Sequence, residues 1–239
     1  MSVQMQKLPS GLAQYCALLK KDLVREFHTF DMLSSMALYA VLVLVVYGVA
    51  LSQMPAGSDV VGIAPGLLWA LIVFTSLMGL NRSFSYEKEN NCLEAVLLAP
   101  LDRSVIFLAK ATSNLLFLLL VEVVAVPLFC FFFLGGQELA CEFALALVPL
   151  VLGTLGMAAV GTFLSTITVN TRGKDVMLAM LMIPLVFPLL YACVSATSAC
   201  FAGGDAFGSM FVPAIAIIVV YDVVMSLLSW VLYDFLVSV

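Results

Sequence analysis

Charged residues are scarce in this chain of 239 residues, because Asp, Glu, Lys and Arg together make up only 10% of it. Soluble domains carry about 25% charged residues and about half apolar ones. Apolar residues reach 64% here. The shortage of charge excludes an ordinary soluble domain and predicts an integral membrane protein.

Motifs for catalysis and ATP binding are also missing. Gly173 and Lys174 are the only adjacent Gly-Lys pair, but Thr168 stands where a P-loop needs its first glycine and Asp175 replaces the required Ser or Thr. The sequence contains no HExxH, GxSxG or CxxCH motif and no paired intramembrane histidines. We therefore expect no enzyme activity, and any ATP hydrolysis must come from a partner.

Metal and haem ligands are equally sparse. The six cysteines include no CxxC and no metal-ligand spacing, and most are expected to act as small buried apolar residues. A bridge between Cys141 and Cys200 near the outer face is the alternative. The single histidine, His28, falls on the polar side of a predicted helix and is expected to be a surface residue. We expect no metal site and no haem ligand in this chain.

The sequence contains six apolar runs, and each has a length close to the roughly 20 residues that a helix needs to cross a hydrocarbon core. They are residues 32–51, 63–80, 113–134, 143–169, 176–200 and 211–236. The runs predict an all-α integral membrane protein with six transmembrane helices in a single domain over residues 1–239. All ten Lys and Arg residues lie before the first run, between the second and third, or between the fourth and fifth. The positive-inside rule therefore places both termini in the cytoplasm.

Residues 10–30 predict an amphipathic helix at the membrane surface. Apolar residues recur at helical spacing on one face: Leu12, Tyr15, Cys16, Leu19, Leu23, Phe27 and Phe30. The opposite face carries Gln14, Lys21, Arg25 and His28. Such a helix lies in the interface plane with its apolar face in the lipid. The alternative is an extended start to the first span, which would bring the polar face into lipid.

Seven of the 25 charged residues lie between 81 and 104, which connects the second and third spans. A helix over 84–98 would place Glu87, Asn91 and Glu94 on one side and apolar residues on the other. It is too short and too charged to span the membrane, so it is predicted to lie at the surface. Pro100 would end it, and Arg103 with Lys110 would mark the start of the third span. The alternative is an ordinary solvated loop.

Residues 63–110, IAPGLLWALIVFTSLMGLNRSFSYEKENNCLEAVLLAPLDRSVIFLAK, resemble the signature region of the haem exporter protein B family. The matching features are the IAPG-x-x-W start, the LE-x-x-L-L-x-P helix end at 93–100 and the following FLAK. The later stretches LGTLGMAAVGT (152–162) and MIPLVFPLLYA (182–192) also fit. The resemblance covers nearly all of the chain beyond about the first twelve residues.

The resemblance implies an ABC-2-like permease subunit for cytochrome c biogenesis in the bacterial inner membrane. The segment 81–104 would then contain the coupling helix that docks on a cytoplasmic ATPase. The expected coupling residues are Glu87, Glu89, Asn91, Leu93, Glu94, Leu97, Leu98 and Pro100. Further implied partners are a haem-handling membrane protein C, a small protein D and a periplasmic haem chaperone E. ATP and haem would be handled by these partners, and no cofactor would be bound by this chain alone.

Two other functions remain open at the level of sequence. One is a permease of another ABC exporter, for a lipid-linked or drug-like substrate, because its six-span pattern and coupling segment would look similar. The other is an intramembrane haem-binding electron carrier, which the missing haem ligands disfavour.

Polar residues and prolines inside the spans are the candidates for an intramembrane gate or subunit contact. Glu122 lies in the third span, where a carboxylate must be paired, protonated or facing a polar cavity, and Pro127 predicts a kink five residues later. The alternative role for Glu122 is a carboxyl satisfied by a neighbouring Ser, Thr or backbone group. Asp222 in the sixth span raises the same question. Pro184 and Pro188 predict either a broken fifth span followed by a re-entrant segment or an ordinary kinked span.

Overall fold

The computed structural model describes residues 11–55, 59–89, 103–134, 143–168, 171, 173–202 and 207–237. These ranges fold into seven α-helices and one short π-helix, and they contain no strand. The elements are α1 (Gly11–Thr29), α2 (Asp31–Ser52), α3 (Val60–Glu89), α5 (Arg103–Leu134), α6 (Phe143–Thr168), α7 (Lys174–Ala202), η1 (Phe207–Phe211) and α9 (Val212–Val237).

Six helices of the described chain are long and apolar enough to cross a membrane, namely α2, α3, α5, α6, α7 and η1 together with α9. The predicted all-α membrane fold with six spans is therefore confirmed. Two helices extend well beyond their apolar runs. α3 continues past residue 80 to Glu89, and α5 begins at Arg103 rather than at 113.

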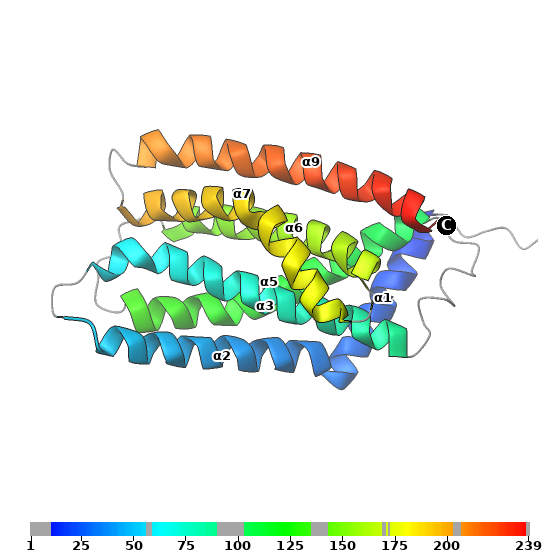
Figure 1. Cartoon of the computed structure of the whole chain (residues 1–239), viewed down its shortest axis with the longest axis horizontal. Helices are drawn as coiled ribbons and strands as arrows, with labels where there is room; N and C mark the ends of the chain where they lie inside the picture. Colours follow the sequence, from blue (N-terminus) through cyan, green and yellow to red (C-terminus); the bar gives the residue numbers. More distant parts are fainter. Residues whose placement is uncertain are drawn as a thin grey trace, which may run out of the picture.

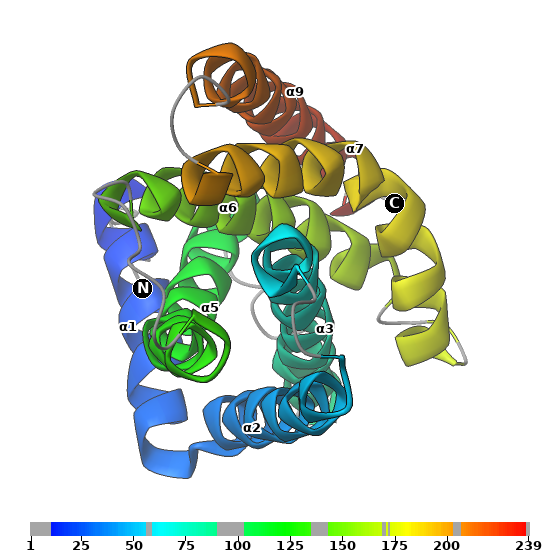
Figure 2. The ribbon, with the colours of Figure 1, turned by 90° about the vertical axis from the view of Figure 1, so that its left-hand side faces the viewer.

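The six long helices lie side by side along the longest axis of the molecule (Figure 1). Seen from one end, α3 occupies the centre and is surrounded by α2, α5, α6 and α7 (Figure 2). α9 packs on the outside of α6 and α7. More of the apolar stretch of α3 is buried than of α2 or α9, and α6 is buried further still.

α1 does not continue the first span but crosses the end of the bundle to which α9 also leads (Figure 1). Phe30 separates α1 from α2 and adopts a left-handed conformation with φ 53°. That conformation is uncommon for a residue other than glycine and turns the chain sharply. The two helices are thus distinct, and the alternative of one extended first span is wrong. We call this end of the bundle the α1 end.

Close packing of α6 on α3 and α7 uses glycines. A Cβ atom at Gly153 would collide with the Trp69 ring of α3 and the Cys193 sulfur of α7. At Gly161 it would collide with the side chain of Leu80. Glycine lets these helices approach closely, as small residues do in membrane helix interfaces.

α7 is a single helix that contains both Pro184 and Pro188 and runs on to Ala202. Its first half runs obliquely to its second half (Figures 1 and 2). Each proline lacks the N–H that would bond to the carbonyl four residues earlier, which explains the bend. Over residues 174–202 the fifth span is therefore kinked rather than broken.

Candidate functional site

An ion pair joins α1 to α5 at the α1 end. The Asp22 carboxylate lies 3.6 Å from the Lys110 Nζ, measured to its Oδ2 atom. Their side chains are only 5% and 8% exposed. Ser113 Oγ donates to the same Oδ2 atom at 3.4 Å, and Lys21 Nζ lies 3.4 Å from Oδ1. Since breaking a buried pair leaves a charge without compensation, this cluster fixes the position of α1 on α5.

A second acidic residue of α1 holds the start of α2. Glu26 is 2% exposed, and its Oε1 atom accepts hydrogen bonds from the backbone N–H groups of Met32 and Leu33, both at 2.8 Å. The first N–H groups of a helix have no partner within the helix. A carboxylate at this end satisfies two of them and interacts favourably with the helix dipole. α1 is therefore tied to both α5 and α2.

The side of α1 that packs on the bundle is polar, since its buried residues are Gln14, Asp22 and Glu26. Several of its apolar residues point outward, including Leu12 (79% exposed) and Phe27 (48% exposed). The sequence prediction placed Gln14 on a surface-facing polar side, which is wrong because Gln14 is buried. It also missed Asp22 and Glu26. Their four-residue spacing was the available signal, but nothing in the sequence links Asp22 to Lys110.

Glu122 of α5 makes one hydrogen bond to another helix. Thr154 Oγ1 of α6 donates to its Oε1 atom at 2.7 Å. Within the described chain, the carboxyl group makes no other hydrogen bond. Its side chain borders two hollows, an inner one against Thr75 and Ser76 of α3 and an outer groove between α5 and α6.

The outer groove, which we call the α5–α6 groove, has a volume of about 280 Å³. It is open at the surface of the bundle, since Val123 is 70% exposed and Val151 is 47% exposed. Its lining residues are Leu119, Glu122, Val123, Val126, Pro127, Leu147, Leu150 and Val151. Pro127 lies inside α5 and has no N–H, so the Val123 carbonyl loses its normal helical donor.

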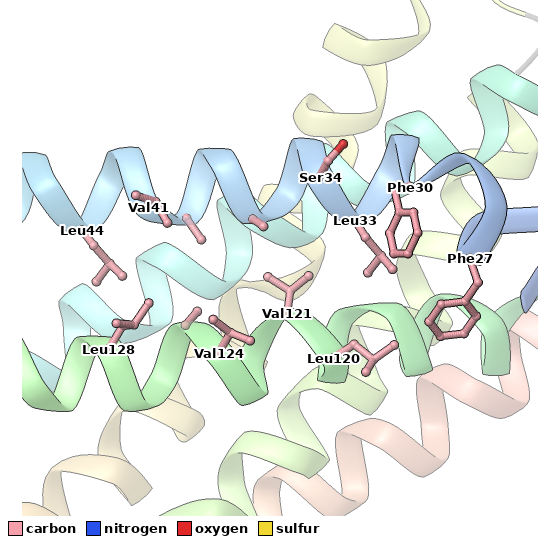
Figure 3. Close-up of a pocket in the computed structure, with 13 residues that line it drawn as sticks. Phe27, Phe30, Leu33, Ser34, Val41, Leu44, Leu120, Val121, Val124 and Leu128 are labelled. Carbon is pink, nitrogen blue, oxygen red and sulfur yellow. The ribbon is translucent and has the colours of Figure 1, made fainter.

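A different groove, between α2 and α5, is almost entirely apolar (Figure 3). Its volume is about 350 Å³, and the rings of Phe27 and Phe30 lie at one end of it. Ser34 is its only lining residue with a polar side chain, and that hydroxyl donates to the Asp31 carbonyl. None of the residues that line this groove is charged, so the groove has no feature that would select one apolar occupant over another.

Asp222 of α9 is 5% exposed, and neither carboxyl oxygen has a hydrogen-bond partner among the described residues. The group packs against α6 at Gly156, where a Cβ atom would collide with it. The described structure gives Asp222 no polar neighbour comparable to Thr154.

Polar side chains also link the spans nearer the α1 end. Ser83 Oγ donates to Asn114 Oδ1 at 3.0 Å, and Asn114 Nδ2 donates to Thr162 Oγ1 at 2.9 Å. All three are buried, so they join α3, α5 and α6 in one chain of hydrogen bonds. The sequence analysis did not single them out, because isolated Ser, Asn and Thr residues in apolar spans do not reveal their partners.

The predicted coupling residues are only partly within the described chain. Glu87 and Glu89 belong to the last turns of α3. The rest lie outside the described residues, namely Asn91, Leu93, Glu94, Leu97, Leu98 and Pro100. Of the alternative Cys141–Cys200 bridge, Cys141 also lies outside them.

Haem and metal ligands do not gather in the described part of the chain. His28 is exposed, and its Nδ1 donates to the Val24 carbonyl at 2.8 Å. No group of three or more His, Cys, Asp and Glu side chains could hold a metal ion among the residues described. The polar groups present are suited to holding helices together and to contacts within the membrane.

Comparison with known proteins identifies the family. The chain is 31% identical over 150 residues to heme exporter protein B of Rhodobacter capsulatus, which covers 63% of this chain and 66% of that protein. It is 29% identical over 152 residues to heme exporter protein B of Paracoccus denitrificans (63% and 68%). It is 30% identical over 128 residues to heme exporter protein B of Pseudomonas aeruginosa, an alignment that covers 54% of this chain and 56% of that protein.

These alignments span about two thirds or less of this chain. The family model described as CcmB protein matches far more of it, over residues 13–230. That match takes in α2 to α7 and most of α1 and α9. The chain is thus a member of the CcmB protein family.

Proposed function

We propose that this chain is the membrane permease subunit of an ABC-type complex that exports haem or releases a haem-loaded periplasmic chaperone during cytochrome c maturation. The observation that carries the proposal is the family match over residues 13–230 on a bundle with six membrane-spanning helices. The relatives named heme exporter protein B support it. The complex lies in the bacterial inner membrane, with both termini of this chain in the cytoplasm.

ATP hydrolysis is supplied by a separate ATPase subunit, because this sequence has no P-loop. Haem is handled by partners, which are a membrane protein C, a small protein D and a periplasmic chaperone E. This subunit then contributes movement rather than chemistry.

The lengths of α3 and α5 favour such a role. α3 has 30 residues and α5 has 32, so each is about 45 Å long. A hydrocarbon core is only about 30 Å thick. The end of α3 and the start of α5, which flank residues 90–102, can therefore project beyond the core. A force on that segment would reach α3 at the centre of the bundle and α5 beside it.

The test is the docking of the ATPase on the coupling segment. We expect Glu94→Lys to reduce recovery of the ATPase with the detergent-solubilised complex by about tenfold or more, because reversing a partly desolvated interfacial charge costs a few kcal/mol. We place Glu89 at the rim of the docking surface, so Glu89→Lys should change recovery by about twofold at most. Cytochrome c yield should fall in the same order.

Both variants should reach the membrane in equal amounts, because neither residue lies within an apolar run. Undiminished ATPase recovery with Glu94→Lys at matched expression would rule out the coupling assignment for this face.

A further inference from the structure

With Glu122 ionised, the residues that line the α5–α6 groove offer hydrogen-bond acceptors but no side-chain donor. Thr154 occupies one oxygen of Glu122 and leaves Oε2 without a hydrogen bond in the described chain. The Val123 carbonyl lacks its helical donor because of Pro127. All other side chains that line the groove are those of Leu, Val and Pro, which cannot donate.

The groove lies in the apolar part of α5, far from either end of the helix. Glu122 is 12 residues before Leu134, the end of α5, which is about 18 Å along the helix. Lipid tails at that depth offer no hydrogen bonds, and acidic side chains within spans almost always face a protein partner or a water-filled cavity. Val123, beside Glu122, is 70% exposed, so the described chain does not itself cover this site.

We propose that the α5–α6 groove is the docking site for a transmembrane helix of a different subunit, which inserts a hydrogen-bond donor toward Glu122 and the Val123 carbonyl. The donor is a Ser, Thr, Tyr, Trp, Lys or Arg side chain on an otherwise apolar helix. The groove supplies apolar contacts on both sides through Leu147 and Val151 of α6 and Val126 of α5.

Other occupants fit this chemistry less well. A phospholipid tail has no donor. An anionic ligand would place its own acceptors against the Glu122 carboxyl. A second copy of this chain, related by a two-fold axis through the groove, would place Glu122 opposite its own copy, because such an interface brings the same patch of both subunits together.

Glu122 lies 19 residues along α5 from its start at Arg103, and the proposal rests on the proposed function only in requiring a second membrane subunit. Its test places a photo-crosslinking residue, p-benzoylphenylalanine, at Val123 in cells that make the whole complex. Val124 is the matched control, since it is the next residue at the same depth, 58% exposed, and lines the α2–α5 groove instead.

We expect the Val123 probe to form an adduct with one membrane protein. Peptide mapping should locate the attachment in a transmembrane helix, within one turn of a donor residue. Glu122→Leu should reduce this adduct about threefold to tenfold, in line with measured interhelical hydrogen bonds in membranes. Glu122→Gln should retain most of it, because the amide still offers an oxygen. The Val124 adduct pattern should not change.

Pro127→Ala provides a test that does not threaten folding. Alanine is the best helix former and restores the N–H that binds the Val123 carbonyl, so the adduct should fall about threefold. An adduct with lipid alone, with a second copy alone or with a helix that has no donor would overturn the proposal. It would also fail if neither Glu122→Leu nor Pro127→Ala lowered the yield. A weakened ATPase pull-down with Glu94→Lys would leave this result unaffected.

Discussion

α5 makes polar contacts with other helices at two levels, and these contacts differ in how complete they are. At the α1 end, Lys110 meets Asp22 in an ion pair that is buried within the chain, which we call the closed contact. Deeper in the span, Glu122 receives one hydrogen bond from Thr154 and borders a groove that is open at the surface.

The difference separates a structural contact from an incomplete one. A buried charge must be matched, and the chain matches Asp22 with cations from both α1 and α5. Glu122 receives a hydrogen bond from a single hydroxyl, that of Thr154. Where the partner groups are present in the same chain, the contact holds the fold; where one is missing, the fold leaves room for another subunit.

The largest effect should come from breaking the closed contact. Asp22→Asn keeps the shape of the side chain but leaves the Lys110 ammonium without its buried anion, so we expect a loss of about 3 kcal/mol in the free energy of unfolding. Thermal unfolding in detergent would measure it. Asp31→Asn is the control, because Asp31 is exposed and should cost about 0.5 kcal/mol or less. Equal losses in the two variants would mean that the ion pair is not needed.

A smaller effect is expected at the start of α2. Glu26→Ala removes the oxygen that accepts from the Met32 and Leu33 N–H groups, which should cost about 2 kcal/mol because two buried donors lose their partner. Hydrogen exchange of the first turn of α2 should become faster. Glu26→Gln retains an acceptor oxygen and should cost less than half as much. If Glu26→Ala left the exchange rate unchanged, the cap would be dispensable.

The smallest effect should come from the open contact. Thr154→Val preserves the shape of the side chain and removes the donor to Glu122, with an expected loss of about 1 kcal/mol. Thr166→Val is the matched control on the same helix, because its hydroxyl donates only to the Thr162 carbonyl within α6. A loss for Thr154→Val as large as that for Asp22→Asn would erase the distinction between the two contacts.

Hydropathy predicted the number and nature of the spans because each helix must be apolar over the width of the bilayer. It could not predict helix ends, because a segment can stay helical beyond the point where its apolar run stops. α3 passes through Arg82 to Glu89, although hydropathy falls at Asn81. Likewise, two prolines indicate a weakened helix, but only packing decides between a bend and a break, and α7 bends.

The candidate sites were predictable in part. Glu122 was identified because a carboxyl inside a span is costly, and Pro127 because it lacks an N–H. Their combination into one groove depends on α6, which lies beside them only in the folded bundle. The burial of Gln14, Asp22 and Glu26 on α1 was not predicted, because periodicity of apolar residues cannot detect a cation on a distant helix.

The contact between α1 and α5 also constrains the order of events during synthesis. Asp22 and Ser113 are 91 positions apart, so at about 5 to 20 residues per second the ribosome needs on the order of ten seconds to make the partner surface. Until then Asp22 has neither the Lys110 ammonium nor the Ser113 hydroxyl as a partner. α1 can therefore dock on α5 only after α2 and α3 have been made, although its contact with the start of α2 can form earlier.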